Sequence, residues 1–277
     1  MNQKSTALKA GAGKAVATPG PQGGALAEYD PELLKALGSE TGALTDLTKE
    51  DVAIPFLTIL QPLSKQVTPG DSSYIEGAKP GQILQTVTKE VFAFTDVLVC
   101  DYRRSFIEWV PRDKGGGFRG EHGPEYENIF NGKLDRATGK AKLENGHDLV
   151  DTRSFYLLVA NEDGMHYPAI CSMASSQVKK AKTLVNLLMT YVPPGMAKRA
   201  VSYPAWAAVY RLGSVLESND KGKWFGWTIQ RLGLNQSIDA ARSAEAFRAQ
   251  IRGGSIVVDR TQTEELDPTE TGGTDRL

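Results

Sequence analysis

Short apolar runs separated by turn residues recur along this 277-residue chain, and they limit its fold more than any other feature. The runs are rich in Val, Ile and aromatic side chains, which favour a β-sheet. Residues 161–164 and 219–222 have the Asn, Asp and Gly content of hairpin turns. Because few helical patterns alternate with the runs, an antiparallel barrel or sandwich is favoured. We expect strands at residues 82–86, 97–102, 106–110, 154–160, 165–171, 205–212, 224–231 and 255–258.

Two segments do not fit the strand pattern. Residues 53–63 are apolar, but Pro55 and Pro62 interrupt them, and proline lacks the N–H that a helix interior or a central strand needs. We therefore expect an extended segment packed on the core. Residues 114–145 are Gly-rich and polar, which predicts a long loop or a poorly packed hairpin inserted in the sheet.

Two helices are predicted from apolar residues spaced three and four apart. The first is capped by Ser175 or Ser176 and ends before Pro193, and it places lysines opposite its apolar stripe. The second spans residues 237–251. The apolar stripes comprise Val178, Ala181, Leu184, Val185 and Leu188 in the first helix, and Ala240, Ala244, Phe247 and Ile251 in the second.

The folded part is expected to be one domain. Residues 1–45 are dense in Gly, Ala and Pro, and they cannot bury enough apolar surface to offset the entropy lost on ordering. We therefore expect a disordered region at residues 1–45, with a short helix at residues 31–37, then a domain at residues 46–258. A disordered acidic tail is expected at residues 259–277.

The cysteines and the hydropathy favour a cytoplasmic protein. Cys100 and Cys171 lie in apolar, strand-like segments, where a thiol usually acts as a small hydrophobe. No apolar run approaches the ~20 residues that cross a bilayer, and the first residues lack the apolar stretch of a secretory signal. We expect a protein in a reduced compartment, away from membranes.

Charge is distributed unevenly, although the formal net charge is only −1. The last seventeen residues carry five acidic residues and one basic residue, whereas residues 171–216 contain no Asp or Glu. A basic core and an acidic tail therefore cancel in the sum. The basic residues of the acid-free stretch are Lys179, Lys180, Lys182, Lys198, Arg199 and Arg211.

The sequence contains few of the residue patterns that enzymes use for catalysis or metal binding. The three histidines stand apart in the sequence, without the spacing of a metal site. A Gly-Ala-Gly-Lys segment near the N-terminus lacks the remaining residues of a phosphate-binding loop, and no nucleophile elbow is present. We expect no cofactor. Asp101, Glu108 and Asp113 are the candidates for a nuclease-like Mg²⁺ site, although such carboxylates also balance neighbouring arginines.

Basic and aromatic residues are interleaved in two places. Residues 102–119 combine five bases with four aromatic rings, and the same mixture recurs at Arg211 and residues 221–227. Proteins that bind single strands need both kinds of side chain, because cations follow phosphates and flat rings stack on any base. Phe225 and Trp227 share one face of a strand and Trp224 takes the other, so one set is expected in the core. For every ring, core packing is the alternative to base stacking.

Four segments carry a resemblance to a known family. They are Asp51-Val-Ala-Ile-Pro-Phe-Leu-Thr-Ile-Leu-Gln-Pro-Leu-Ser, Tyr74-Ile-Glu-Gly-Ala, Phe106-Ile-Glu-Trp-Val-Pro-Arg-Asp-Lys-Gly-Gly-Gly and Glu217-Ser-Asn-Asp-Lys-Gly-Lys-Trp-Phe-Gly-Trp. Over roughly residues 46–235, the chain resembles bacteriophage single-stranded DNA-binding proteins. The resemblance implies an OB-like barrel that coats single strands during phage replication and recombination in the host cytoplasm. Such proteins often end in an acidic tail closed by Phe, whereas this chain ends in Leu277, which weakens the case for a partner bound by the tail.

The sequence therefore predicts a β-rich α+β protein with an OB-like antiparallel barrel, an inserted loop and one or two packed helices. We expect it to bind single-stranded DNA regardless of sequence, with replication or recombination proteins as candidate partners of the tail, and we leave self-assembly open. The alternatives are a metal-dependent nuclease or other DNA-processing enzyme, and a structural protein of the virion. The stacking candidates are Trp109, Phe118 and Trp224, and the phosphate-contact candidates are Arg103, Arg104, Arg112, Lys114, Lys179, Lys180, Lys182, Arg211, Lys221 and Lys223.

Overall fold

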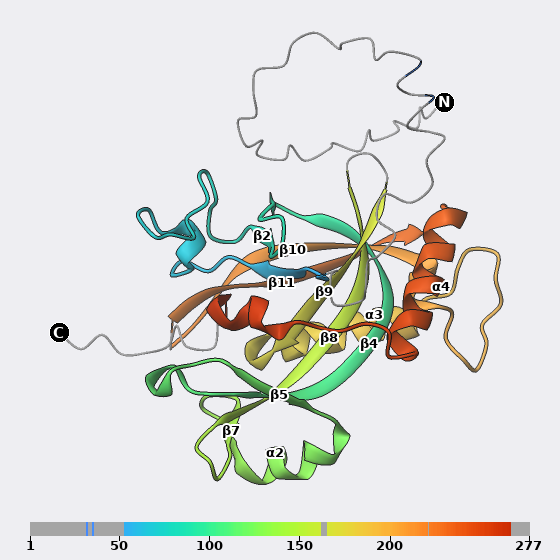
Figure 1. The fold of residues 1–277 in the computed structure, drawn as a ribbon. Coiled ribbons are helices and arrows are strands. Elements are labelled where there is room, and N and C mark those ends of the chain that lie inside the picture. The colour runs from blue at the N-terminus through green and yellow to red at the C-terminus, as the bar shows by residue number, and fades with distance from the viewer. Residues whose placement is uncertain (1–31, 33–34, 36–52, 162–164, 221, 267–277) are drawn as a thin grey trace, which may run out of the picture.

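The computed structural model describes residues 32, 35, 53–161, 165–220 and 222–266 (Figure 1). The predicted disordered region at residues 1–45, with nearly all of its helix at residues 31–37, and the chain beyond residue 266 lie outside these ranges. Within the described residues, no helix is long and apolar enough to cross a membrane.

One curled sheet forms the centre of the fold (Figure 1). Its strands are β1 (Phe56–Ile59), β2 (Ile83–Gln85), β3 (Val91–Phe92), β4 (Thr95–Trp109), β5 (Phe118–His122), β6 (Leu134–Asp135), β7 (Lys140–Lys142), β8 (Asp148–Ala160), β9 (His166–Ala174), β10 (Ala208–Asn219) and β11 (Gly222–Leu234). The strand order is β11-β10-β4-β8-β9-β1-β2-β3, with β5 on β4 and the β6–β7 pair on β8. The two end strands, β11 and β3, do not pair with each other in the described chain, so the sheet is a half-barrel. The β-rich α+β class is confirmed, but the sheet is mixed because β1 and β9 run parallel.

β1 corrects the prediction that residues 53–63 merely pack on the core. It lies inside the sheet, antiparallel to β2 and parallel to β9. The prolines bracket this strand, because Pro55 precedes it and Pro62 follows it, and neither removes a donor from its ladder. The carbonyl of Pro55 even accepts a hydrogen bond from the amide of Ile170 at 2.9 Å.

β4 corrects the prediction of separate strands at residues 97–102 and 106–110. It is one strand of 15 residues, and its pairing with β8 runs from Val97 to Trp109 with a register shift between Val99 and Asp101. The exposed side chains of Tyr102 and Arg103 interrupt the apolar pattern, while the backbone ladder continues beneath them. Side-chain periodicity alone does not reveal such a continuous ladder.

The two predicted hairpins are confirmed by the strand pairing. Ala160 of β8 pairs with His166 of β9, and Asn219 of β10 pairs with Gly222 of β11. Residues 162–164 and 221 of the two turns lie outside the described residues. Residues 255–258 form no strand, which corrects the last strand prediction.

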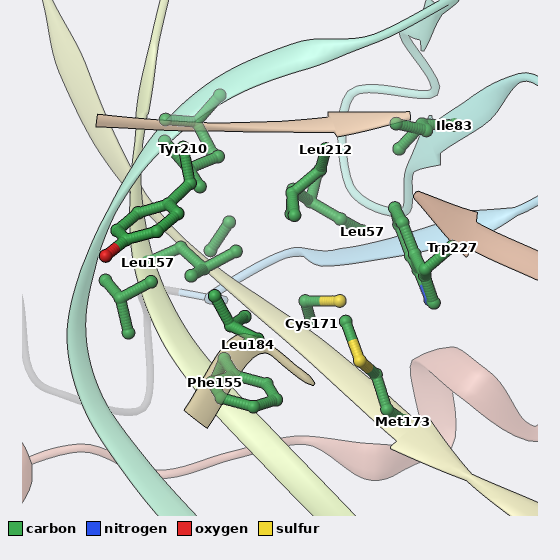
Figure 2. Close-up of a cluster of buried hydrophobic side chains, with 14 of the residues drawn as sticks. Leu57, Ile83, Phe155, Leu157, Cys171, Met173, Leu184, Tyr210, Leu212 and Trp227 are labelled. Carbon is green, nitrogen blue, oxygen red and sulfur yellow. The ribbon is translucent and has the colours of Figure 1, made fainter. Parts of the chain in front are cut away.

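Helices α3 (Val178–Met189) and α4 (Ile238–Arg252) cover opposite faces of the sheet, and their predicted apolar stripes are confirmed except at Val178, which lies in neither core. α3 contributes Ala181 and Leu184 to a core that includes Tyr210 and Trp227 (Figure 2). α4 buries all four predicted stripe residues in a second core, which contains Tyr156. The sheet therefore has an apolar layer on each side.

Residues 112–147 are a small lobe, and the predicted loop or poorly packed hairpin is wrong. The lobe contains β5, helix α2 (Glu127–Lys133), β6 and β7. Phe130 of α2 and Ala141 of β7 pack on Phe106 and Leu149 in a core of their own. The extra length of β4 and β8 beyond the main sheet supports this lobe, which Figure 1 shows at the lower end of the molecule.

The folded part extends beyond its predicted end at Val258. A 3₁₀ segment, Arg260–Leu266, follows, and the Arg260 side chain is buried. Its guanidinium donates to Glu121 Oε2 at 2.7 Å and to Ser154 Oγ at 3.1 Å. Gln262 makes a further contact with Thr86 Oγ1 at 2.7 Å. These bonds anchor the first part of the predicted tail to the sheet.

The two cysteines are buried and unpaired, as predicted. Burial raises the pKa of Cys100 to about 12 and also raises the pKa of Cys171. Because the thiolate is the reactive form, we expect neither thiol to react with a disulfide reagent at neutral pH until denaturant unfolds the protein. The absorbance of the released thiol measures this reaction. Rapid reaction of either cysteine in the native protein would contradict the burial.

Candidate nucleic-acid interface

A cavity of about 540 Å³ opens where β1 and β9 separate. β1 pairs with β9 only through Phe56 and Leu57 and then continues along β2, whereas β9 stays with β8 to Ala174. Thr58 and Ser172, the residues that follow the paired positions, both line the cavity. The divergence of two neighbouring strands therefore creates the hollow.

Four other parts of the fold contribute basic or indole side chains to the cavity wall. The β10–β11 hairpin contributes Lys223 and Trp224, and the end of β4 contributes Trp109. The turn between β6 and β7 brings Arg136, and the C-terminal 3₁₀ segment brings Arg260. Among the described residues, no Asp or Glu lines the cavity, so its fixed side-chain charges are all positive.

Two buried glutamines hold the β10–β11 hairpin against the rest of the sheet. The side chain of Gln61 accepts from the amide of Phe225 at 2.9 Å and donates to its carbonyl at 3.0 Å. Gln177 accepts from the amide of Trp227 at 3.0 Å. These backbone groups lie on the edge of β11 that no strand of the described chain covers. The amides of Gln61 and Gln177 therefore replace a neighbouring strand and close the cavity on this side.

Trp224 has a fixed indole ring at the cavity wall. Its Nε1–H donates to Glu217 Oε2 at 3.0 Å, and Glu217 also pairs with Lys180 Nζ at 2.8 Å. Gly226 leaves the space that this arrangement needs, because a Cβ atom there would collide with the Glu217 carboxylate. The half-buried indole ring of Trp224 is therefore already ordered at the cavity wall. A ligand that contacts it does not lose binding free energy by ordering this side chain.

Trp109 is the second half-buried indole of the cavity. It lies at the end of β4 and contacts Phe118 of β5 edge to face, with ring centroids 5.8 Å apart. Phe118 therefore supports Trp109 in the structure. Trp227 is buried, and Phe225 packs against the same core, which confirms that one face of this strand is core.

Ser175 is a strained residue at the cavity wall. Its φ of 47° lies in the left-handed region, which is unfavourable for a residue with a side chain. Its Oγ is buried and has no hydrogen-bond partner among the described residues. The predicted capping of α3 by Ser175 or Ser176 is wrong, because Ser175–Gln177 form a 3₁₀ turn and neither serine caps the helix.

Several predicted phosphate contacts are already engaged by carboxylates. Arg104 donates to Asp151 at 3.0 Å and to Glu127 at 2.6 Å. Arg211 forms a two-point contact with Asp96 at 2.7 and 2.8 Å. Lys180 is held by Glu217, as described above. These cations neutralise acidic side chains of the fold, and none of them lines the cavity.

The other predicted cations do not gather at the cavity. Of these, only Lys223 lines it, and Lys221 lies outside the described residues. Lys179 and Lys182 are exposed on α3, which begins directly after the wall residue Gln177. The remaining candidates are Arg103 on β4, and Arg112 and Lys114 in the exposed turn after it. The predicted set thus supplies Trp109, Lys223 and Trp224 to one site.

Arg260 and Arg136 are wall residues that the sequence did not suggest. Arg260 is buried against Glu121. Burial alone would raise the pKa of Glu121, but the hydrogen bond and charge of Arg260 outweigh it and lower the pKa. An arginine in a polar C-terminal stretch gives no local sign of burial, because its partner is 139 residues away.

Beside the cavity, Glu108 brings together two histidines that are far apart in the sequence. His122 Nε2 lies 2.8 Å and His147 Nδ1 lies 2.6 Å from the two carboxylate oxygens. Asn145 donates to the same carboxylate at 3.0 Å. Among the described residues, no group of His, Cys, Asp and Glu has the geometry of a metal site.

Two of the three candidate magnesium ligands, Asp101 and Glu108, are far apart. Asp101 and Glu108 are seven residues apart on β4, or about 23 Å along a strand. Asp101 instead contacts Arg252 at 3.3 Å and Arg248 at 3.9 Å, as expected for a carboxylate that balances arginines. Glu108 pairs with histidines rather than with arginines.

Glu108 gives a pH-dependent prediction for stability. Burial raises its pKa, but the hydrogen bonds from His147, His122 and Asn145 outweigh this and lower the pKa to about 2. An unfolded glutamate has a pKa of about 4.3, so this contribution is fully present above about pH 5 and is lost as the pH falls toward 2. We expect Glu108→Gln to reduce the free energy of unfolding by about 2–3 kcal/mol near neutral pH, and by progressively less below pH 5. Urea unfolding across this range measures the difference. A constant difference at every pH would contradict the assignment.

Comparison with known proteins identifies a family. Residues 22–257 match the family described as Pam3 phage gp34-like protein. No curated protein matches the chain. No solved structure matches it either.

Proposed function

This chain belongs to the Pam3 phage gp34-like protein family, and we propose that it serves a bacteriophage as a single-stranded DNA-binding protein that tolerates any sequence. The observation that carries the proposal is the cavity at the divergence of β1 and β9. Two half-buried indole rings and the cations Lys223 and Arg136 line this hollow, and no carboxylate of the described chain does. Rings stack on bases of any identity while cations hold phosphates, so this combination suits a single strand.

The electrostatics around the cavity favour an anionic ligand. α3 starts beside it, so the partial positive charge of the helix N-terminus adds to Lys179, Lys182 and Lys223. The residues of α3 and its approach, 171–189, include no acidic side chain. A flexible, strongly charged strand can follow such a surface, whereas a stiff duplex does not enter a hollow between two strands.

The OB-like relationship is part of the proposal. An OB fold is a partly open barrel that binds oligonucleotides on one face and its adjoining loops. The sheet here is also an incompletely closed barrel, and the β10–β11 hairpin and the small lobe both contribute residues to the cavity wall. The proposed strand would cross between the hairpin and the lobe.

Equilibrium binding of labelled oligonucleotides tests the function. Single-stranded DNA, duplex DNA and RNA are titrated with the full chain at several salt concentrations, and the anisotropy of the label reports binding. The expected result is preference for the single strand, with an affinity that falls by a logarithmic slope of about −0.7 for every phosphate neutralised. Affinity that ignores salt, or equal affinity for duplex, would contradict the proposal. Cleavage of the DNA on addition of Mg²⁺ would instead favour the nuclease alternative.

The acidic tail is expected to compete weakly with DNA. Thr263 lines the cavity three residues before the described chain ends, and Asp267, Glu270 and Asp275 follow in the sequence. Tethered charges act at high effective concentration but are screened beyond about 8–10 Å by physiological salt. Truncation after Leu266 should raise the affinity for single-stranded DNA at low salt, with a gain that shrinks as salt is added. The cut keeps Arg260, which the fold needs.

A control separates the effect of the tail's charge from the effect of its length. Replacing the tail by a neutral Gly-Ser sequence of equal length should raise the affinity as much as truncation does. Unchanged affinity of both variants at low ionic strength would show that the tail does not reach the binding site, and would leave replication or recombination proteins as its proposed partners.

A further inference from the structure

The cavity has a larger volume than the binding of a strand of any sequence requires. A volume of about 540 Å³ falls in the range of pockets that enclose a small molecule. Stacking and phosphate contacts need only an open surface with rings and cations. The hollow between Thr58 and Ser172 therefore has room for a ligand group that inserts between the two strands.

Ser175 carries two local costs at the wall of this cavity. Its left-handed backbone is strained, and its buried hydroxyl has no hydrogen-bond partner among the described residues, which is also unfavourable. Strained residues of this kind cluster at ligand sites, where a bound group completes the missing contact. The neighbouring polar wall groups are occupied, since Gln61 and Gln177 hold the hairpin and Ser172 Oγ lies 3.1 Å from Ser154 Oγ.

We propose that the cavity between β1 and β9 receives one base turned out of the bound strand, and that the buried Ser175 hydroxyl rotates into the cavity to hydrogen-bond with the edge of that base. Trp109 and Trp224 supply flat walls for the base, and Lys223 and Arg136 supply cations for the flanking phosphates. A base that leaves the stack is recognised by this combination of ring contacts and hydrogen bonds to its edge. The inference rests on the proposed function and adds the class of group that enters the pocket, a nucleobase.

Mononucleotides test this inference separately from strand binding. The full chain is titrated with single deoxynucleotides, with deoxyribose 5-phosphate and with inorganic phosphate, and tryptophan emission is followed. We expect deoxynucleotides to change the emission in a saturable manner and to compete with an oligonucleotide. The two ligands without a base should have no such effect.

The Ser175→Ala variant identifies the pocket. Loss of one hydrogen bond should weaken mononucleotide binding by about 2- to 10-fold, while the salt slope for an oligonucleotide stays the same. Ser255→Ala, at an exposed position outside the cavity, is the matched control and should change neither quantity. Circular dichroism confirms that both variants fold.

The outcomes distinguish the base pocket from the proposed function on which it rests. Strong oligonucleotide binding without any mononucleotide binding would overturn the base pocket and leave the proposed function intact. Mononucleotide binding that Ser175→Ala weakens, without oligonucleotide binding, would support the pocket and overturn the strand-binding function. Equal binding of deoxynucleotides and deoxyribose 5-phosphate would overturn the pocket, because the base would then contribute nothing.

Discussion

Replacing Gln61 by leucine is expected to lower the free energy of unfolding by about 2–4 kcal/mol. The Gln61 amide satisfies both the N–H and the C=O of Phe225 on the free edge of β11. Leucine offers neither a donor nor an acceptor, and each buried polar group without a partner costs about 1–3 kcal/mol. Urea unfolding followed by circular dichroism measures the loss. The variant should also bind single-stranded DNA more weakly, because the hairpin that carries Lys223 and Trp224 is no longer held in place.

Gln250→Leu is the matched control for this substitution. Gln250 is exposed on α4, so its replacement should change the stability by no more than about 0.5 kcal/mol. If Gln61→Leu were as stable as this control, the amide of Gln61 would not be what holds the hairpin. The shape of the cavity would then depend on apolar packing of Phe225 against Gly81.

Replacing Trp224 by alanine is expected to weaken binding to single-stranded DNA by roughly tenfold to a hundredfold, with the fold intact. Stacking of one base on an aromatic ring contributes about 1–3 kcal/mol, and 1.4 kcal/mol corresponds to a factor of ten. Trp224 is half-buried and its ring is fixed by Glu217 rather than by the core, so its removal leaves the buried clusters unchanged. Anisotropy titrations at one salt concentration measure the change.

Two further variants give this prediction a contrast. Trp224→Phe keeps a flat ring and should retain most of the affinity. Trp206→Phe alters an indole that packs with the α4 cluster on the opposite face of the sheet, and it should leave binding unchanged. A Trp224→Ala protein that binds as tightly as the original chain would contradict stacking at this ring. A protein that fails to fold would show that the ring belongs to the core.

The spacing of apolar residues in the sequence predicts the elements that bury one regular face, namely the two long helices and β11. The stripes of α3 and α4 follow from a repeat of 3.6 residues, and the buried face of β11 follows from alternation along a strand. The position of β1 inside the sheet depends instead on pairing with β2 and β9, which no pattern within residues 53–63 encodes. The lobe at residues 112–147 was missed because its core uses only a few apolar side chains.

The sequence predicts only part of the candidate site, because contacts between residues far apart in the sequence decide which side chains reach it. The chemistry of Trp109, Lys223 and Trp224 predicts a role in binding, and the fold brings them to one cavity. Arg104 and Arg211 have the same chemistry, but their carboxylate partners lie 47 and 115 residues away in the sequence. Gln61 reaches Phe225 across 164 residues. A local count of charges cannot distinguish an arginine that awaits a phosphate from one that already has a partner.

Photochemical crosslinking of single-stranded DNA to the full chain tests the central claim most directly, because it reports where the strand lies. The crosslinked peptides are identified by mass spectrometry after digestion. We predict that they contain Trp224 with Lys223 from β11 and Trp109 from β4, and that high salt abolishes them. Crosslinks confined to α4 and the face of the sheet that α4 covers, with none in the peptides that line the cavity, would contradict the account.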